Sequence, residues 1–178
     1  GIDIIFTREP GGTPIGERIR SIILDRDCAE MDDMTEAMLY AAARAQHVAQ
    51  VIRPALSAGK IVICDRFVDS SIAYQGYGRG LGEAVSVIND YAVCGCLPDV
   101  TFLMKMDPRV GRRRINVQQQ DRLEREKDDF HVRTYEGYLE LEKKYPGRIV
   151  GIDAARSIEE IKIDIYKKLE EVLKGVTE

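Results

Sequence analysis

Four short runs of mostly apolar residues constrain the fold of this chain more than any other feature of its sequence. They lie at 2–6, 61–64, 100–104 and 149–152. Successive apolar residues, as opposed to alternating ones, are typical of strands that are covered on both faces of a sheet. Helical patterns separate the runs, at 14–24, 35–56, 83–93, a segment opened by Asp107-Pro108, 127–145, and a last helix behind the capping box Ser157–Glu160. The alternation predicts an α/β fold with a parallel sheet and helices on both faces.

Length and composition narrow the class of protein. A chain of 178 residues suits one domain, 1–178, with a substantial core. The longest apolar run is far shorter than the roughly 18 residues of a membrane helix, so no membrane association is expected. A net charge of −4 gives little reason to expect binding to nucleic acid. The four cysteines lack metal-site spacing, which favours reduced, mostly buried thiols in a cytoplasmic protein.

The segment DRFVDSSIAYQGYGRG at 65–80 carries the strongest chemical signal. Asp65 and Arg66 directly follow the second apolar run, at the sheet edge where ligands bind in open α/β folds. Asp65 can hold a hydrated Mg²⁺, and Arg66 can bind a phosphate with two parallel hydrogen bonds. Ser71, Tyr74 and Gln75 offer polar groups to a base or sugar, and Gly76, Gly78, Gly80 and Gly82 predict a loop. A glycine-rich surface turn would leave the Asp-Arg pair unexplained, so we interpret the segment as part of a phosphoryl-transfer site.

Two further motifs give weaker evidence of a ligand-binding site when each is taken alone. TREPGGT at 7–13 follows the first run, and its glycines allow the backbone to approach a ligand closely. An ordinary turn between a strand and a helix explains it equally well. Tyr40 and Arg44 share one helical face, where a ring could stack on a base and a guanidinium could bind a base carbonyl. A core tyrosine beside a surface arginine is the common alternative.

Between 109 and 125 there are six arginines and two acidic residues. Such a cluster can neutralise charge that develops on a transferred phosphoryl group. A solvated basic helix and a nucleic-acid patch are the alternatives, and this segment alone does not distinguish between them.

Taken together, the motifs resemble the thymidylate kinase family of the bacterial type, whose members make dTDP from dTMP and ATP. The resemblance covers nearly the whole chain, in family order and with family spacing. The matching stretches are TREPGGT (7–13), AAR (42–44), 65–80, LPDVTFLMKMDP (97–108), DRLE (121–124) and GYLELEKKYPGRIVGIDA (137–154). The resemblance implies the P-loop nucleoside monophosphate kinase fold, Mg²⁺ and ATP as cofactor and phosphoryl donor, and a homodimer.

The resemblance also implies roles for single residues. Tyr40 would stack on thymine, Arg44 would bind its carbonyl, and Tyr74 would crowd the 2′ position of the sugar. Asp65 would lie near Mg²⁺, and a lid at about 109–125 would close over ATP. The implied dTMP site comprises Glu9, Pro10, Arg20, Tyr40, Arg44, Arg66, Ser71, Tyr74 and Gln75, with Arg20 and Arg66 on the phosphate. The implied catalytic residues are Arg66 and the lid arginines Arg113, Arg114 and Arg122.

The sequence departs from the family pattern at one point. Family members open with a strand, a G-x-x-x-x-G-K-[ST] phosphate loop and a helix, and this sequence contains no such motif. We expect that the native protein carries this segment. The alternative is a shortened, non-catalytic relative that binds thymidine nucleotides. A deoxynucleoside kinase would share the Asp65-Arg66 pair, but Arg20 and Arg66 favour an acceptor that already carries a phosphate.

Overall fold

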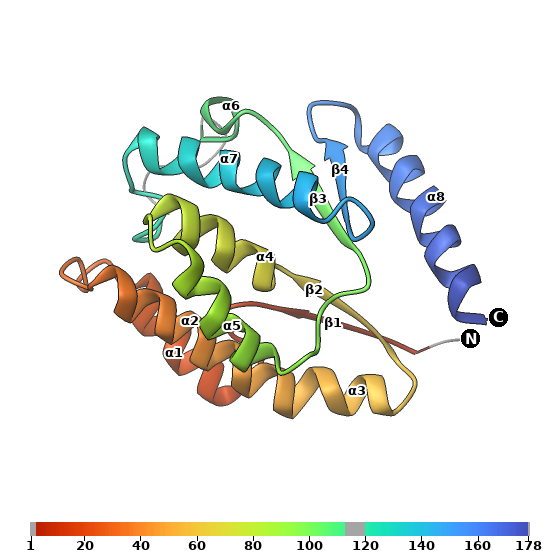
Figure 1. Ribbon diagram of the computed structural model, residues 1–178, viewed down its shortest axis with the longest axis horizontal. Coiled ribbons are helices and arrows are strands. Elements are labelled where there is room, and N and C mark those ends of the chain that lie inside the picture. The colour runs from red at the N-terminus through yellow and green to blue at the C-terminus, as the bar shows by residue number, and fades with distance from the viewer. Residues whose placement is uncertain (1–2, 113–119, 178) are drawn as a thin grey trace.

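The computed structural model describes residues 3–112 and 120–177 (Figure 1). Strands and helices alternate along it, as the sequence predicts. The strands are β1 (Ile4–Arg8), β2 (Ile61–Asp65), β3 (Thr101–Lys105) and β4 (Ile149–Asp153). The helical elements are α1 (Pro14–Leu24), α2 (Asp33–His47), η1 (Val48–Ile52), α3 (Arg53–Ser57), α4 (Val68–Ser71), η2 (Ile72–Gly78), α5 (Glu83–Val93), α6 (Pro108–Arg112), α7 (Asp128–Lys144) and α8 (Ile158–Thr177).

All four strands take part in parallel pairing, which confirms the predicted fold class. Strand β1 pairs with β2, and Arg8 lies opposite Asp65 at the carboxyl end of the pair. Strand β3 pairs with β4. Within the described residues the strands form these two pairs, and β2 does not pair with β3. The motif residues that follow β1 and β2 are therefore brought to one edge, as parallel pairing requires.

Local signals define the helices well. Helices α1 and α5 have the predicted bounds, and the hydroxyl of Thr13 caps α1 by accepting a hydrogen bond from the Gly16 N–H at 2.9 Å. The long predicted helix is continuous from α2 through the π-helical turn η1 to α3. The predicted capping box is present, since the Ser157 N–H donates to the carboxylate of Glu160 at 3.0 Å.

The glycine-rich loop predicted from Gly76 onward is wrong for its first half. Residues 68–78 form the helical elements α4 and η2, and η2 packs along α7. Glycine is used here because the two helices approach closely. A Cβ on Gly78 would lie 2.6 Å from Oγ1 of Thr134, and one on Gly137 would lie 2.7 Å from the ring of Tyr77. Tertiary packing thus overrides the low helix propensity of glycine.

This close packing gives a direct test. Gly137→Ala should lower the free energy of unfolding by about 1–3 kcal/mol, because a methyl group there overlaps the Tyr77 ring and forces η2 away from α7. Gly147→Ala is the control, since a Cβ at Gly147 meets no atom within 4 Å in the described part of the chain. Chemical denaturation of both variants measures the difference. Equal stability of the two would contradict the close approach of η2 and α7.

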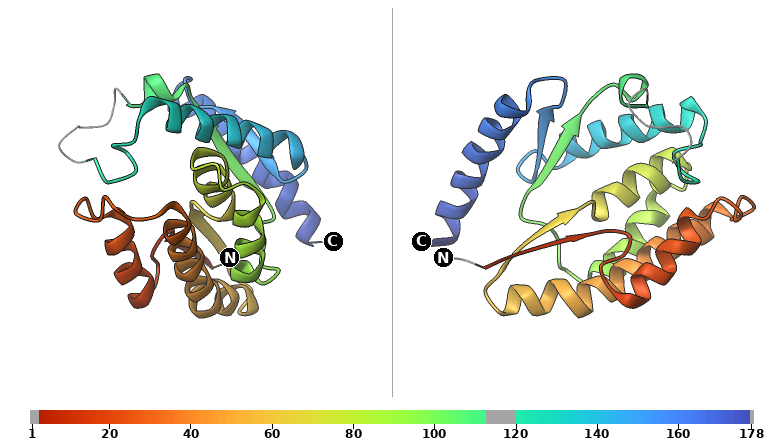
Figure 2. Two further views of the ribbon diagram at one scale, coloured as in Figure 1. Left: turned by 60° about the vertical axis from the view of Figure 1, so that its left-hand side comes forward. Right: turned by 180° about the vertical axis from the view of Figure 1, so that it is seen from behind.

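The helices pack in two sets (Figures 1 and 2). Helix α2 packs on α1 and α5, whereas α7 packs on η2 and β4. A buried cluster of Ala73, Leu103, Leu141 and Ile149 joins η2, β3, α7 and β4. An ion pair adds a second connection, because Arg148 donates to both carboxylate oxygens of Asp69 at 2.6 and 2.7 Å.

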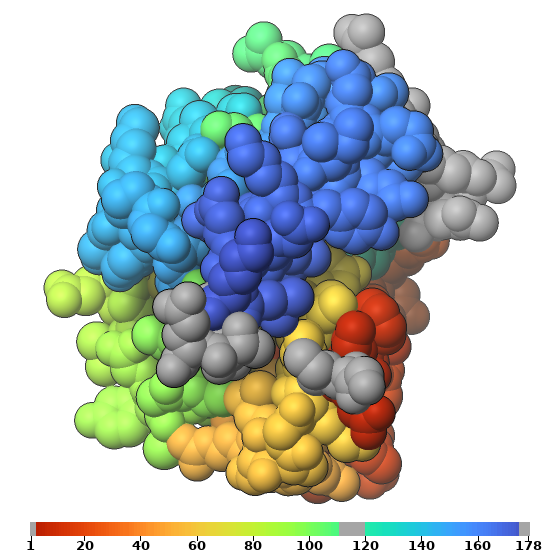
Figure 3. Space-filling view, turned by 90° about the vertical axis from the view of Figure 1, so that its right-hand side faces the viewer, coloured from red at the N-terminus to blue at the C-terminus, as the bar shows by residue number. Residues whose placement is uncertain are grey.

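Three further features concern the last helix, possible membrane spans and the cysteines. Helix α8 lies on the outside of β4 (Figures 1 and 3). No helix in the described ranges combines the length and the apolar character that a membrane span requires. The four cysteines are free thiols, but the prediction that they are mostly buried is wrong, since Cys94 is exposed and the other three are partly exposed.

Candidate functional site

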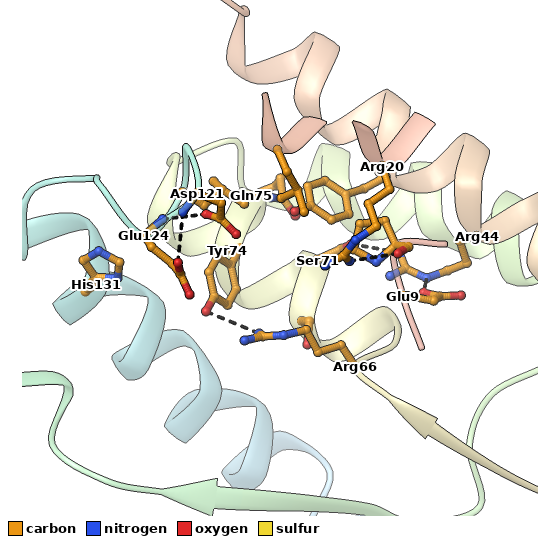
Figure 4. A pocket seen from close by; sticks show the side chains of 15 residues that line it. Glu9, Arg20, Arg44, Arg66, Ser71, Tyr74, Gln75, Asp121, Glu124 and His131 are labelled. Carbon is orange, nitrogen blue, oxygen red and sulfur yellow. Dashed lines mark hydrogen bonds and ion pairs between the residues drawn. The ribbon is translucent and has the colours of Figure 1, made fainter. Parts of the chain in front are cut away.

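One pocket contains all nine residues that the sequence analysis assigned to a dTMP site (Figure 4). They come from the loop after β1, from α1 and α2, from the end of β2, and from α4 and η2. The pocket has about 640 Å³ of atom-free space and is partly open to solvent. It is lined by Glu9, Pro10, Arg20, Leu24, Tyr40, Arg44, Arg66, Ser70, Ser71, Tyr74, Gln75, Asp121, Leu123, Glu124 and His131.

The deepest charged group is Arg44. Its side chain is 1% exposed, and its Nε donates to Oε2 of Glu9 at 2.7 Å. Its Nη1 donates to the hydroxyl of Ser71 at 2.8 Å and to the side-chain carbonyl of Asn89. Nη2 has no hydrogen-bond partner among the described residues. The guanidinium is therefore fixed in one orientation and keeps one nitrogen for a ligand.

Glu9 is buried by its neighbours. Oε1 of Glu9 accepts a hydrogen bond from Nδ1 of His47 at 2.9 Å, and Nε2 of His47 lies 2.7 Å from the hydroxyl of Thr7. Gly12 permits this packing, since a Cβ there would lie 2.7 Å from the His47 ring and its φ of +75° favours glycine. The Glu9–Pro10 peptide bond is cis. Glu9 and Pro10 of the TREPGGT motif line the pocket, so the motif contributes to the site and is more than a turn between a strand and a helix.

Arg66 lines the same pocket. Its guanidinium lies 5.3 Å from the centre of the Tyr74 ring, and its Nη1 donates to the Tyr74 hydroxyl at 3.3 Å. Arg66 has a φ of 63°, which is uncommon for a residue other than glycine and is found most often at functional sites. Arg20 donates to the carbonyl oxygen of Pro10 at 3.0 Å. Two guanidinium groups therefore line the same pocket as the buried Arg44.

Two ionisable groups near the pocket are held neutral. Burial, followed by the negative charge of Glu36, raises the pKa of Tyr40, so its ring presents a neutral phenol. Burial and then the charge of Glu9 raise the pKa of the Cys64 thiol to about 12. Cys64 is therefore a protonated thiol at neutral pH and a poor nucleophile. The site favours binding and electrostatic chemistry over covalent catalysis by cysteine.

Gln75 and Tyr40 form part of the pocket wall, and Glu36 holds the Gln75 amide without lining the pocket itself. Gln75 is 1% exposed, and its Nε2 donates to Oε1 of Glu36 at 2.9 Å. Arg79 pairs with the same carboxylate at 2.9 Å and lies over the Phe130 ring. The polar groups of this wall are fixed by neighbours that do not themselves line the pocket.

The remaining predicted residues are placed differently. Arg122 does not line the pocket, because its Nη2 donates to Glu36 at 2.5 Å and its Nε donates to the carbonyl oxygen of Ile23 at 2.9 Å. This geometry makes Arg122 a support for the pocket wall, and its catalytic role stays a prediction. Arg113 and Arg114 lie outside the described residues. Asp65 is exposed at the end of β2, and its backbone carbonyl accepts from the Glu9 N–H at 3.0 Å.

Sequence reasoning missed several residues that support the site. Glu36 and His47 lie on the same face of α2 as Tyr40 and Arg44, at spacings of three or four residues. That spacing was visible in the sequence and is the signal that could have identified them. Asn89 is on α5 and gave no such signal, since its contact with Arg44 joins residues that are 45 positions apart. The pocket residues that were not predicted are Leu24, Ser70, Asp121, Leu123, Glu124 and His131.

Comparison with known proteins agrees with this arrangement. The family model described as thymidylate kinase matches residues 1–165. The chain is 49% identical to thymidylate kinase of Halalkalibacterium halodurans, over 97% of this chain and 84% of that protein. It is 50% identical to the enzyme of Pediococcus pentosaceus, over 96% and 83% of the two chains. It is 52% identical to that of Lactobacillus helveticus, over 95% and 82%. The chain therefore belongs to the thymidylate kinase family.

Proposed function

We propose that this protein transfers the γ-phosphoryl group of ATP to the phosphate of dTMP, forming dTDP and ADP, and that the pocket holds dTMP. The observation that carries the proposal is that the nine residues implied by the resemblance all line one pocket in a chain of this family. The alternative of a non-catalytic relative gains no support from the comparisons.

The pocket has a chemically distinct region for each part of dTMP. Tyr40, Gln75 and Arg44 provide a ring, an amide and a buried guanidinium for the base. Tyr74 lies between this region and Arg66, where a sugar would lie. Arg66 and Arg20 provide positive charge for the phosphate. Phosphoryl transfer needs mainly positioning and charge neutralisation from a protein, and these groups supply both.

The residues fit a Mg²⁺–phosphate complex, with Asp65 as the protein ligand. Among the described residues no three potential ligands gather into a metal cage. Mg²⁺ needs no such cage, because it commonly binds one or two carboxylates together with phosphate oxygens and water. When bound, the ion would neutralise charge on the phosphates. Arg113 and Arg114 stay the proposed lid arginines. A homodimer and a cytoplasmic location are further proposals, which rest on the family resemblance.

Two measurements test the proposed function. Calorimetric titration should show that dTMP binds at least about tenfold more tightly than thymidine, because Arg66 and Arg20 can form charge-assisted bonds to the phosphate. A coupled assay with ATP and Mg²⁺ should show ADP formation that depends on dTMP. Transfer to thymidine in preference to dTMP would favour a deoxynucleoside kinase. Tight dTMP binding by the full-length native protein without ADP formation would favour the non-catalytic alternative.

A further inference from the structure

The side-chain oxygen of Gln75 is buried in the pocket wall. Oε1 of Gln75 has no hydrogen-bond partner within the described residues, although Gln75 is 1% exposed and lines the pocket. Buried polar atoms are nearly always hydrogen-bonded, and leaving one unpaired is costly. An acceptor held in this way fits a ligand that brings a donor to it.

The other end of the Gln75 amide is fixed by Glu36. The Glu36 side chain is fully buried, and its two oxygens accept hydrogen bonds from three side chains. Oε1 accepts from Nε2 of Gln75 at 2.9 Å and from Nε of Arg79 at 3.3 Å. Oε2 accepts from Arg79 at 2.9 Å and from Arg122 at 2.5 Å. Both oxygens are thus occupied by donors.

Glu36 remains ionised in this environment. Burial alone would raise its pKa, but the hydrogen bonds from Arg79 and Gln75 and the positive charge of Arg79 outweigh burial and lower the pKa. An ionised carboxylate has no proton to donate. If the Gln75 amide rotated by half a turn, its carbonyl oxygen would face the carboxylate of Glu36 and both groups would repel.

We propose that Glu36 is a positioning residue for base recognition, which holds Gln75 so that its carbonyl oxygen faces the nucleobase. This inference rests on the proposed function and extends it to a residue that does not line the pocket. Oε1 of Gln75 is a hydrogen-bond acceptor, and Nη2 of Arg44 is a hydrogen-bond donor. The pocket therefore offers the base one acceptor and one donor. Thymine presents a donor at N3 beside an acceptor at O4 and matches the pair. Cytosine presents an acceptor at N3 beside a donor at N4 and mismatches both groups.

The test uses Glu36→Gln and two nucleotides of the same shape, dTMP and 5-methyl-dCMP. A neutral amide at position 36 can donate, so Gln75 can rotate and present its nitrogen to the base. The selectivity ratio is the dissociation constant of 5-methyl-dCMP divided by that of dTMP, measured by calorimetry. In Glu36→Gln this ratio should fall by about tenfold or more, which is the effect of one buried hydrogen bond to the base. Selectivity that remains would come from Arg44.

Three further variants separate positioning from general loss of structure. Asp33→Asn also removes a carboxylate that pairs with Arg79, at 3.2 Å, but Asp33 is half-exposed, and the Gln75 amide donates to Glu36 instead. It should leave the ratio unchanged.

Gln75→Met should reduce the ratio, and adding Glu36→Gln to Gln75→Met should change it no further. An equal loss of affinity for both nucleotides in Glu36→Gln would assign Glu36 a structural role and overturn the proposal.

A measurement on the unmodified protein covers the case in which Glu36→Gln does not fold. With ¹⁵N-labelled dTMP and ¹³C-labelled protein, NMR should show a coupling across the hydrogen bond between N3 of the base and Cδ of Gln75. Saturating dTMP without this coupling would refute the orientation of Gln75 while leaving the proposed function intact. Failure of dTMP to bind at all would refute the proposed function itself.

Discussion

Replacing Arg44 by methionine should weaken the binding of dTMP and of thymidine by about hundredfold each, and should lower the free energy of unfolding by about 3–5 kcal/mol. The stability loss follows from burial. Arg44 and Glu9 are 1% and 3% exposed, so removing the guanidinium leaves a buried carboxylate that keeps its hydrogen bond from His47 but loses its ion pair with Arg44. The binding loss should be equal for both ligands, because the proposed partner of Arg44 is the base, which dTMP and thymidine share.

A double variant shows whether the stability loss of Arg44→Met comes from the broken ion pair or from the cavity that the shorter side chain leaves. Glu9→Gln combined with Arg44→Met removes the uncompensated charge and should recover part of the lost stability. Glu17→Gln is the control, because the Arg8–Glu17 pair is nearly half exposed on both sides and should cost no more than about 1 kcal/mol. Urea unfolding measures all three. A double variant less stable than Arg44→Met alone would show that the buried charge is not the main cause.

Replacing Arg66 by alanine should weaken dTMP binding by about hundredfold and leave thymidine binding nearly unchanged. Arg66 lines the pocket, and its guanidinium can form two parallel hydrogen bonds to a phosphate. Because the acceptor phosphate is also the nucleophile, turnover of dTMP by the full-length enzyme should fall by about a thousandfold. Arg66 is exposed and its bond to the Tyr74 hydroxyl is long, so the melting temperature should change little.

The matched variants make this result specific. Arg66→Lys keeps the charge and loses the planar fork, so its dTMP affinity should lie between those of the wild type and Arg66→Ala. Arg18→Ala removes an exposed arginine of α1 that does not line the pocket, and dTMP binding should not change. Equal losses for dTMP and thymidine in Arg66→Ala would show that Arg66 does not bind the phosphate.

Some properties of this protein follow from neighbouring residues, and the sequence predicted them. The apolar runs predicted four parallel strands to within two residues, because burial in a sheet selects apolar residues over short stretches. The Ser157–Glu160 capping box and the Thr13–Pro14 start of α1 depend on contacts within one helical turn. The nine pocket residues were also predicted, because the motifs together resemble the thymidylate kinase family and that resemblance implied this set.

Tertiary structure decided what depends on distant residues. Residues 68–78 are helical because α7 packs against their glycines, and that contact joins segments about 60 positions apart, as between Gly78 and Thr134. Glu9 meets Arg44 over 35 positions, and Glu36 meets Gln75 over 39. Composition and spacing show that such charges exist, but not which of them will be buried together. The sequence alone therefore predicted the elements and nine residues that line the pocket. The chain's packing decided which buried partners hold those residues in place, because a buried charge is stable only beside a partner that the fold brings to it.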